Sequence, residues 1–160
     1  MPLDVIIEDE RWSEFGLETL VQRAIEATLL HFGYDVVHWE VSVLGCNDAR
    51  IADLNGDFRA KRQPTNVLSW PSVDRFVGAG KRPKAPTGDP ELGDIAISYE
   101  TCKNEAKSGN KPLEHHVTHL IVHGVLHLLG YDHESDDDAD LMEATEIAIL
   151  EGLGIANPYE

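Results

Sequence analysis

Residues 123 to 133 read His-Gly-Val-Leu-His-Leu-Leu-Gly-Tyr-Asp-His, and this segment carries most of what the sequence says about the protein. The first two histidines are four residues apart, so on a helix their imidazoles lie on one face, one turn apart. His133 cannot join them from the next helical turn, because each residue adds about 1.5 Å of rise. Gly130 offers a place where the helix can end and the chain can fold back.

Three neutral imidazoles with a fourth position open are typical of a catalytic zinc site, because structural zinc sites are closed. We therefore predict that His123, His127 and His133 hold about one Zn²⁺ per chain. His119 precedes His123 by four residues, so His119 and His123 form a competing helical pair. We prefer the later pair, because only that pair is followed closely by a turn and a further histidine. His119 would then lie beside the site or be an ordinary histidine of the helix surface.

The motif lacks one residue that a related zinc motif contains. Metzincin peptidases have the pattern H-E-x-x-H-x-x-G-x-x-H, and this chain has the same three histidines and the same glycine. Gly124 stands where that pattern has its glutamate, which is the general base of the peptidase reaction. The site is therefore expected to keep the metal and to be a poor peptidase.

The hydrophobic pattern around this segment predicts an α/β (α+β) fold. Apolar runs and alternation indicate strands at residues 3–8, 36–44, 66–70 and 93–98. Helical spacing indicates helices at residues 13–33, 47–58, 99–107 and 112–129, and a last helix that ends at Gly154. We expect residues 1–160 to form a single domain, with one small mixed sheet of about four strands and about five helices. The helix at 112–129 is apolar nearly all round, which places it at the centre.

The N-terminal sequence Met-Pro-Leu-Asp-Val-Ile-Ile-Glu-Asp-Glu has no basic start and no long apolar run. It does not match a signal peptide, and no stretch of the sequence is long enough to cross a bilayer. The sequence therefore predicts a cytoplasmic protein that does not bind membranes.

Charge is distributed unevenly along the chain. The formal net charge is −16, which by itself disfavours nonspecific binding to nucleic acid. The window from Arg59 to Lys84, however, contains seven basic residues and one acidic residue, Asp74. Its local charge is +6, which leaves a charge of −22 on the rest of the chain. Such asymmetry predicts a localised contact with an anionic partner. For residues 75–84 we favour the simpler interpretation of a solvated, mobile loop.

Three segments of the sequence together resemble the YbeY family of bacterial endoribonucleases, also called rRNA maturation factors. The first segment runs from His119 to His133. The second combines Leu54-Asn55 and Phe58-Arg59 with Pro64-Thr65-Asn66-Val67-Leu68-Ser69-Trp70-Pro71, and the third is Leu92-Gly93-Asp94-Ile95-Ala96-Ile97-Ser98. The segments occur in the family's order. The family usually has Thr-Asp-Val-Leu-Ser-Phe where this chain has Asn66 and Trp70, and the loop at 72–91 looks longer than is usual.

The resemblance implies a zinc-dependent single-strand endoribonuclease that acts in small-subunit rRNA maturation and ribosome quality control. It implies His123, His127 and His133 as metal ligands and Arg59 as the functional arginine of the cleft. Lys61 and Arg62 follow Arg59 closely and are candidate substrate-binding residues. The implied partners are single-stranded or ribosomal RNA and, in addition, ribosomal proteins of the small subunit.

The chemistry of RNA cleavage fits these residue types. Zinc can stabilise charge on the phosphoryl oxygens and lower the pKa of water to about 7. An arginine can hold a phosphate through two hydrogen bonds, which lysine does less well. RNA also carries its own nucleophile in the 2′-OH, so the missing glutamate matters less for RNA than for a peptide.

Two other functions remain open from the sequence. One is a metal-dependent hydrolase of a different substrate, which the missing glutamate disfavours for peptides. The other is a non-catalytic ribosome assembly factor with a structural zinc, whose acidic remainder would attract basic ribosomal proteins.

The ligand assignment makes a stoichiometric prediction. The wild-type protein should contain about one zinc per chain, and the combined substitutions His123→Ala and His127→Ala should remove it. His119→Ala should leave the zinc content unchanged. Elemental analysis of the purified variants measures both, and full zinc content in the double variant would contradict the assignment.

Overall fold

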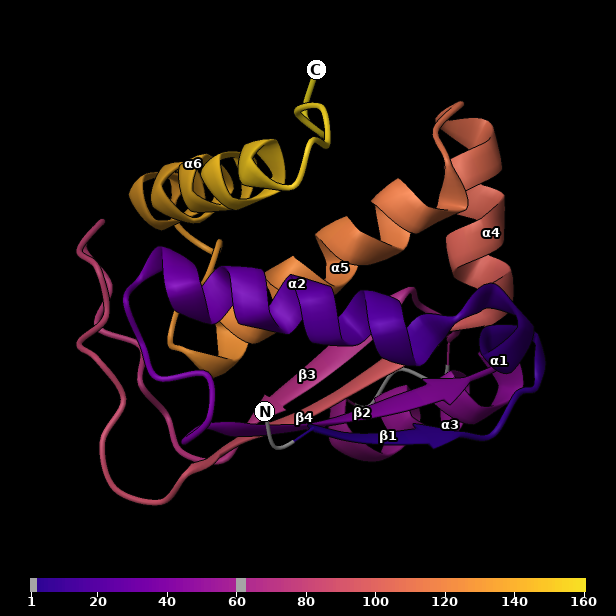
Figure 1. Ribbon diagram of the computed structural model, residues 1–160, viewed down its shortest axis with the longest axis horizontal. Coiled ribbons are helices and arrows are strands. Elements are labelled where there is room, and N and C mark those ends of the chain that lie inside the picture. The colour runs from indigo at the N-terminus through magenta and orange to yellow at the C-terminus, as the bar shows by residue number, and fades with distance from the viewer. Residues whose placement is uncertain (1–2, 60–62) are drawn as a thin grey trace.

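The computed structural model describes residues 3–59 and 63–160, with the side chains of residues 57–59 outside that description. Within these residues a four-stranded sheet lies at the centre, in the order β1-β2-β4-β3 (Figure 1). The strands are β1 (Leu3–Ile7), β2 (Glu40–Cys46), β3 (Val67–Pro71) and β4 (Glu91–Ser98). β1, β2 and β4 are parallel, and β3 pairs antiparallel with β4. The sheet is mixed, which confirms the predicted α/β class.

The described part of the chain contains six helices, one more than the sequence predicted. They are α1 (Arg11–Phe15), α2 (Leu17–His31), α3 (Asp48–Arg59), α4 (Tyr99–Ser108), α5 (Leu113–Leu128) and α6 (Asp136–Gly152). The expected helix at 13–33 is divided at Gly16, whose φ of 85° lies in the left-handed region. Before this break Trp12 is fully buried, and its Nε1 donates a hydrogen bond to Cys46 O at 3.0 Å. The break thus separates a short helix that caps the end of β2 from the long helix that covers the sheet.

The second strand starts and ends later than its predicted range of 36–44. Residues 36–38 form a turn, where Val37 N donates a hydrogen bond to Asp35 Oδ1 at 2.9 Å and the Val37 side chain is 68% exposed. Gly45, which the sequence predicts to end the strand, pairs with Ile97 of β4. A Cβ at Gly45 would lie 2.7 Å from Leu17 Cδ2, so this glycine serves close packing and does not terminate the strand.

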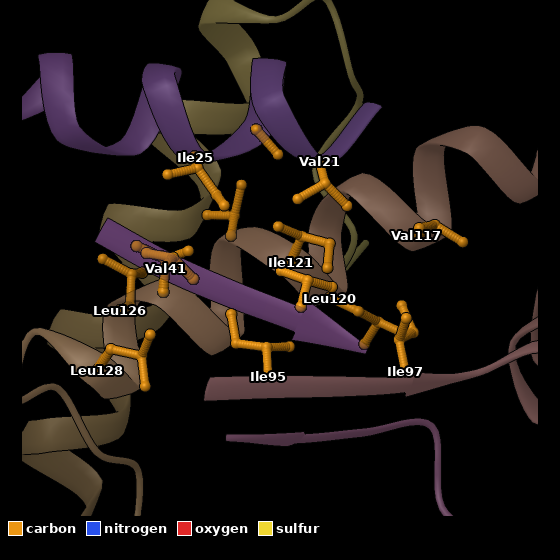
Figure 2. Packing of buried hydrophobic residues seen from close by; sticks show 14 of the residues in the cluster. Val21, Ile25, Val41, Ile95, Ile97, Val117, Leu120, Ile121, Leu126 and Leu128 are labelled. Carbon is orange, nitrogen blue, oxygen red and sulfur yellow. The ribbon is translucent and has the colours of Figure 1, made fainter. Parts of the chain in front are cut away.

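Helix α5 is the central helix, as its apolar sequence predicted. Figure 1 shows α2, α5 and α6 on one side of the sheet and α3 on the other. Figure 2 shows the larger core, in which β2 and β4 face α2 and α5 through the labelled residues Val21, Ile25, Val41, Ile95, Ile97, Val117, Leu120, Ile121, Leu126 and Leu128. The smaller core joins α3 to the opposite face through Cys46, Ile51, Leu68 and Ala96. Among the partly exposed residues of α5 are His119, His123 and His127, which are spaced four positions apart.

The long loop from residue 72 to residue 90 is docked on the rest of the molecule. Arg75 donates hydrogen bonds to Leu128 O at 2.8 Å and to Leu92 O at 3.3 Å. Gly80 N donates to Asp138 Oδ1 at 2.9 Å, which ties the loop to the start of α6. The Arg82 guanidinium lies over the Phe32 ring, 5.4 Å from its centroid. Two basic residues of the predicted anionic contact are thus engaged within the fold.

A membrane-spanning helix is not found among the described residues, since each helix there is either too short or too polar for that purpose.

The contact between Gly130 and the loop predicts a stability effect. Gly130 has a φ of 108°, and a Cβ there would lie 2.5 Å from Arg75 O. Gly130→Ala should therefore lower the free energy of unfolding by about 1–3 kcal/mol. Gly152→Ala is the matched control, because Gly152 is helical and has no atom within 4 Å of the new Cβ. Urea unfolding measures both, and equal midpoints for the two variants would contradict this account.

Candidate metal centre

The three histidines predicted as ligands come together at the C-terminal end of α5. One nitrogen atom from each of His123, His127 and His133 lies within 4.8 Å of the other two. The Nε2 atoms of His123 and His127 are 3.1 Å apart. All three side chains are at least partly accessible to solvent. The cluster could therefore hold a metal ion with a side open for a further ligand.

The turn that returns His133 is built by main-chain hydrogen bonds. Tyr131 N donates to Leu126 O at 2.9 Å, and Gly130 N donates to His127 O at 3.1 Å. This pair of bonds is the Schellman arrangement, in which a glycine with positive φ ends a helix. Asp132 Oδ1 then accepts a hydrogen bond from His133 N at 2.8 Å. Asp132 therefore stabilises the turn.

A buried carboxylate on α6 connects two histidines of α5. Glu146 is fully buried, with its Oε2 3.2 Å from His123 Nδ1 and its Oε1 2.7 Å from His119 Nε2. The Tyr159 hydroxyl donates to Glu146 Oε1 at 2.9 Å. Burial by itself would raise the pKa of Glu146, but the hydrogen bonds from His119 and His123 outweigh it and lower the pKa to about 2. Glu146 is thus a carboxylate that fixes the His123 ring with Nε2 turned towards His127.

Sequence reasoning missed Glu146, although a signal was present. The residue lies within the buried stripe of α6, whose other members are Met142, Thr145, Ile149 and Leu150. A charged residue in such a stripe is rarely buried unless it is paired. The position of Glu146 in α6 could therefore have indicated that it has a buried partner. Which residue that partner is depends on how α6 packs against α5.

His119 does not belong to the cluster of possible ligands. Its Nε2 faces the Glu146 carboxylate, so the structure favours the later helical pair over the competing pair of His119 and His123. At His127, burial and then the neighbouring imidazoles of His123 and His133 lower the pKa to about 4. His127 is therefore neutral at neutral pH, which is the form that binds a metal.

The cluster opens into a cleft of about 580 Å³. One wall is β3 with Thr65 and Asn66 before it, and another is the docked loop at Asp74, Arg75 and Phe76. Asp132 and Glu134 also line the cleft, so its described lining is rich in carboxylates. The described lining does not include Lys81, Arg82 or Lys84.

Gly124 lies on the side of α5 that packs against the sheet. A Cβ at this position would be 3.1 Å from Ile95 Cδ1 of β4. A glutamate side chain would have to displace the core at this point, so the metzincin base is absent here for a packing reason as well.

The other predicted site residues are Arg59, Lys61 and Arg62, and the structure does not describe their side chains. Arg59 ends α3, but its side chain lies outside the described residues, as do Lys61 and Arg62 entirely. The chain resumes just before Thr65 and Asn66, which line the cleft. The segment that carries these three basic residues therefore leads directly into the cleft wall.

The fold is α/β, and its three clustered histidines could hold a metal ion with one side open to the cleft. The family model of endoribonuclease YbeY matches residues 4–154, and the chain belongs to this family. Endoribonuclease YbeY of Ruegeria sp. (strain TM1040) is 54% identical over 164 residues, which cover 99% of this chain and 96% of the relative. Endoribonuclease YbeY of Dinoroseobacter shibae is 53% identical over 163 residues, covering 99% and 90%.

The solved structure of TM1509 from Thermotoga maritima is also similar. Its TM-score is 0.57 at 22% sequence identity, with 99% of each chain covered. At this identity the likeness concerns the fold alone, and it agrees with the mixed sheet and helices described above.

The role of Glu146 makes a prediction about metal affinity. Glu146→Gln should weaken zinc binding about 10- to 100-fold, because the amide no longer holds the His123 ring as a charged acceptor. Glu151→Gln is the control, since Glu151 is an exposed residue of the same helix. Competition titration with a chelating dye measures both affinities. A folded Glu146→Gln variant that binds zinc as tightly as the wild type would exclude the orienting role.

Proposed function

We propose that this chain is a zinc-dependent, single-strand endoribonuclease, in which residues 1–160 act as one metal-dependent hydrolase domain. Membership of a family whose members are named endoribonuclease supports a nuclease that acts on RNA. The observation that carries the metal dependence is the convergence of His123, His127 and His133 at an open cleft.

The donor set fits zinc. Neutral imidazole nitrogens suit Zn²⁺ among the common metals, and three protein ligands leave a position for substrate or water. When bound, the ion would stabilise charge on the phosphoryl group and lower the pKa of water. The low pKa of His127 keeps that ligand neutral at neutral pH, and the contact with Glu146 fixes the ring of His123.

The remaining chemistry is assigned to residues of the chain and to the substrate. We assign to Arg59 the bidentate hold on the reacting phosphate, and to Lys61 and Arg62 the binding of neighbouring phosphates. No carboxylate takes the place of the metzincin base at Gly124, whose position faces Ile95. The 2′-OH of RNA supplies a nucleophile within the substrate, so the reaction class agrees with the site.

We propose that the substrate is ribosomal RNA of the small subunit and that the protein acts in its maturation and quality control in the cytoplasm. Small-subunit ribosomal proteins are the expected protein partners. A second function, a non-catalytic assembly factor with a structural zinc, is favoured by the charge of −22 outside the Arg59–Lys84 window, which suits basic ribosomal proteins.

Cleavage assays on one variant separate the two functions. Arg59→Ala should lower the rate of single-stranded RNA cleavage about 100-fold or more while zinc content stays normal, because only the phosphate contact is lost. Arg23→Ala is the control, since Arg23 is an exposed arginine of α2 that does not line the cleft. The wild type should lose activity in chelator and regain it with zinc. Wild-type cleavage by the Arg59→Ala variant would reject the catalytic role and favour the assembly factor.

The same site predicts a negative result. The zinc-loaded protein should not hydrolyse unstructured peptides, because it has no general base at Gly124. Chelator-sensitive peptide cleavage by protein purified free of contaminating peptidases would overturn the proposed reaction class.

A further inference from the structure

The exposed aromatic side chains of the protein are concentrated at the metal cleft. The structure describes the side chains of all Phe, Trp and Tyr residues except Phe58. Among those described, only Phe76 and Tyr159 are exposed, at 45% and 46%. Both line the cleft that contains the three histidines. Because the other described aromatic residues are buried or half-buried, two exposed aromatic rings at one site suggest a ligand that covers them.

Phe76 is held in place by its neighbours. Its backbone N donates to Asp74 Oδ1 at 3.0 Å, and the preceding Arg75 is bonded to two main-chain carbonyls at the end of α5 and in β4. The edge of the Phe76 ring lies against Gly78, where a Cβ would be 3.3 Å from Cε2 and Cζ. The exposed ring therefore sits on an anchored loop and would lose little freedom when a ligand covers it.

Tyr159 is held by its hydroxyl and presents its ring. The hydroxyl donates to Glu146 at 2.9 Å, and the ring meets His119 edge-on, with centroids 5.5 Å apart and planes at 83°. Its backbone N donates to Asn157 Oδ1 at 2.8 Å. The polar end of this side chain is thus satisfied inside the protein, while almost half of the residue remains accessible.

The rings of Phe76 and Tyr159 lie towards opposite ends of the row that His119, His123 and His127 form on α5. Phe76 follows Arg75, which contacts Gly130 beyond the end of α5, whereas Tyr159 contacts His119, one turn before His123. The nine residues from His119 to the end of α5 at Leu128 correspond to about 14 Å. Figure 1 agrees with this separation, because the loop lies at the start of α6 and the C-terminal tail follows its end. Along α5, His123 and His127 come between His119 and Gly130.

The described lining of the cleft offers little free positive charge. Asp74, Asp132 and Glu134 are acidic, and the guanidinium of Arg75 is bonded to main-chain carbonyls. A polyanion would therefore need an attractive interaction that does not depend on charge, in addition to its proposed contacts with the metal and with Arg59, Lys61 and Arg62. Unpaired bases can provide it, since a base stacked on an aromatic ring stabilises a complex regardless of its sequence.

We propose that Phe76 and Tyr159 are stacking platforms for unpaired bases of an RNA strand, one on each side of the reacting phosphate. This inference rests on the proposed ribonuclease function and adds the residues that select single strands. Bases within a duplex already stack on one another, so they cannot cover these rings without being unpaired. Stacking on both rings would draw the connecting backbone across the histidine cluster.

Binding of two matched strands tests the proposal. One is a short 2′-O-methyl oligoadenylate with a fluorescent label, which lacks the 2′-OH nucleophile, and the other has the same backbone with abasic sugars. Fluorescence anisotropy of zinc-loaded protein should show that Phe76→Ala and Tyr159→Ala each weaken binding of the base-bearing strand about 5- to 150-fold. Binding of the abasic strand should be equal for the wild type and both variants.

Two further variants isolate stacking from other effects. Tyr159→Phe keeps the ring and removes the hydrogen bond to Glu146, so it should weaken binding of the base-bearing strand less than Tyr159→Ala does. Val77→Ala is the control for the loop, because Val77 is 49% exposed but does not line the cleft, and its affinity should not change. Urea unfolding verifies that each variant is folded.

The outcomes distinguish this inference from the function on which it rests. Unchanged affinity of both alanine variants for the base-bearing strand, or an equal loss on the abasic strand, overturns the stacking role while wild-type RNA cleavage still supports the nuclease. A wild type that neither binds nor cleaves RNA overturns both. Selective loss on the base-bearing strand, larger for Tyr159→Ala than for Tyr159→Phe, supports the inference.

Discussion

The packing of α5 is the constraint on which the other features of this protein depend. The helix is covered by the sheet, α2, α4 and α6, and the close approach at Gly124 and Ile95 brings it onto β4. Three of its partly exposed residues recur every four positions and are histidines that line the metal cleft, namely His119, His123 and His127. Their imidazoles therefore open on the same side of the helix. The metal centre is therefore built on a rigid element, which preserves its geometry better than a loop would.

Glu146 connects this helix to the C-terminal part of the chain. A buried carboxylate without partners would cost several kcal/mol, on the order of the whole stability margin of a domain. Here the imidazoles of His119 and His123 favour the charged form, so the pKa falls to about 2, and the Tyr159 hydroxyl donates a further hydrogen bond. These contacts connect α6 and the C-terminal tail to α5 and orient His123.

The acidic character of the protein shapes how it can recognise RNA. With a net charge of −16, long-range attraction to a polyanion is weak, and encounter alone would not select a substrate. Recognition must therefore be local. The described lining of the cleft combines a possible metal centre with two exposed aromatic rings. This combination suits a strand whose phosphates and bases are both accessible, which describes single-stranded RNA and not a duplex.

The sequence by itself determined the α/β class, the number of strands, the central helix and the convergence of the three histidines, because hydrophobic period and ligand spacing are local properties. It misplaced the start of β2 and joined α1 to α2, since a turn at Asp35 and a left-handed glycine at Gly16 compete with periodicity. Only the tertiary structure decided that Glu146 orients His123, that Arg75 anchors the long loop, and that Phe76 and Tyr159 share one cleft. These relations join residues from 17 to 83 positions apart, and their distances are set by how helices pack on the sheet, which no local pattern encodes.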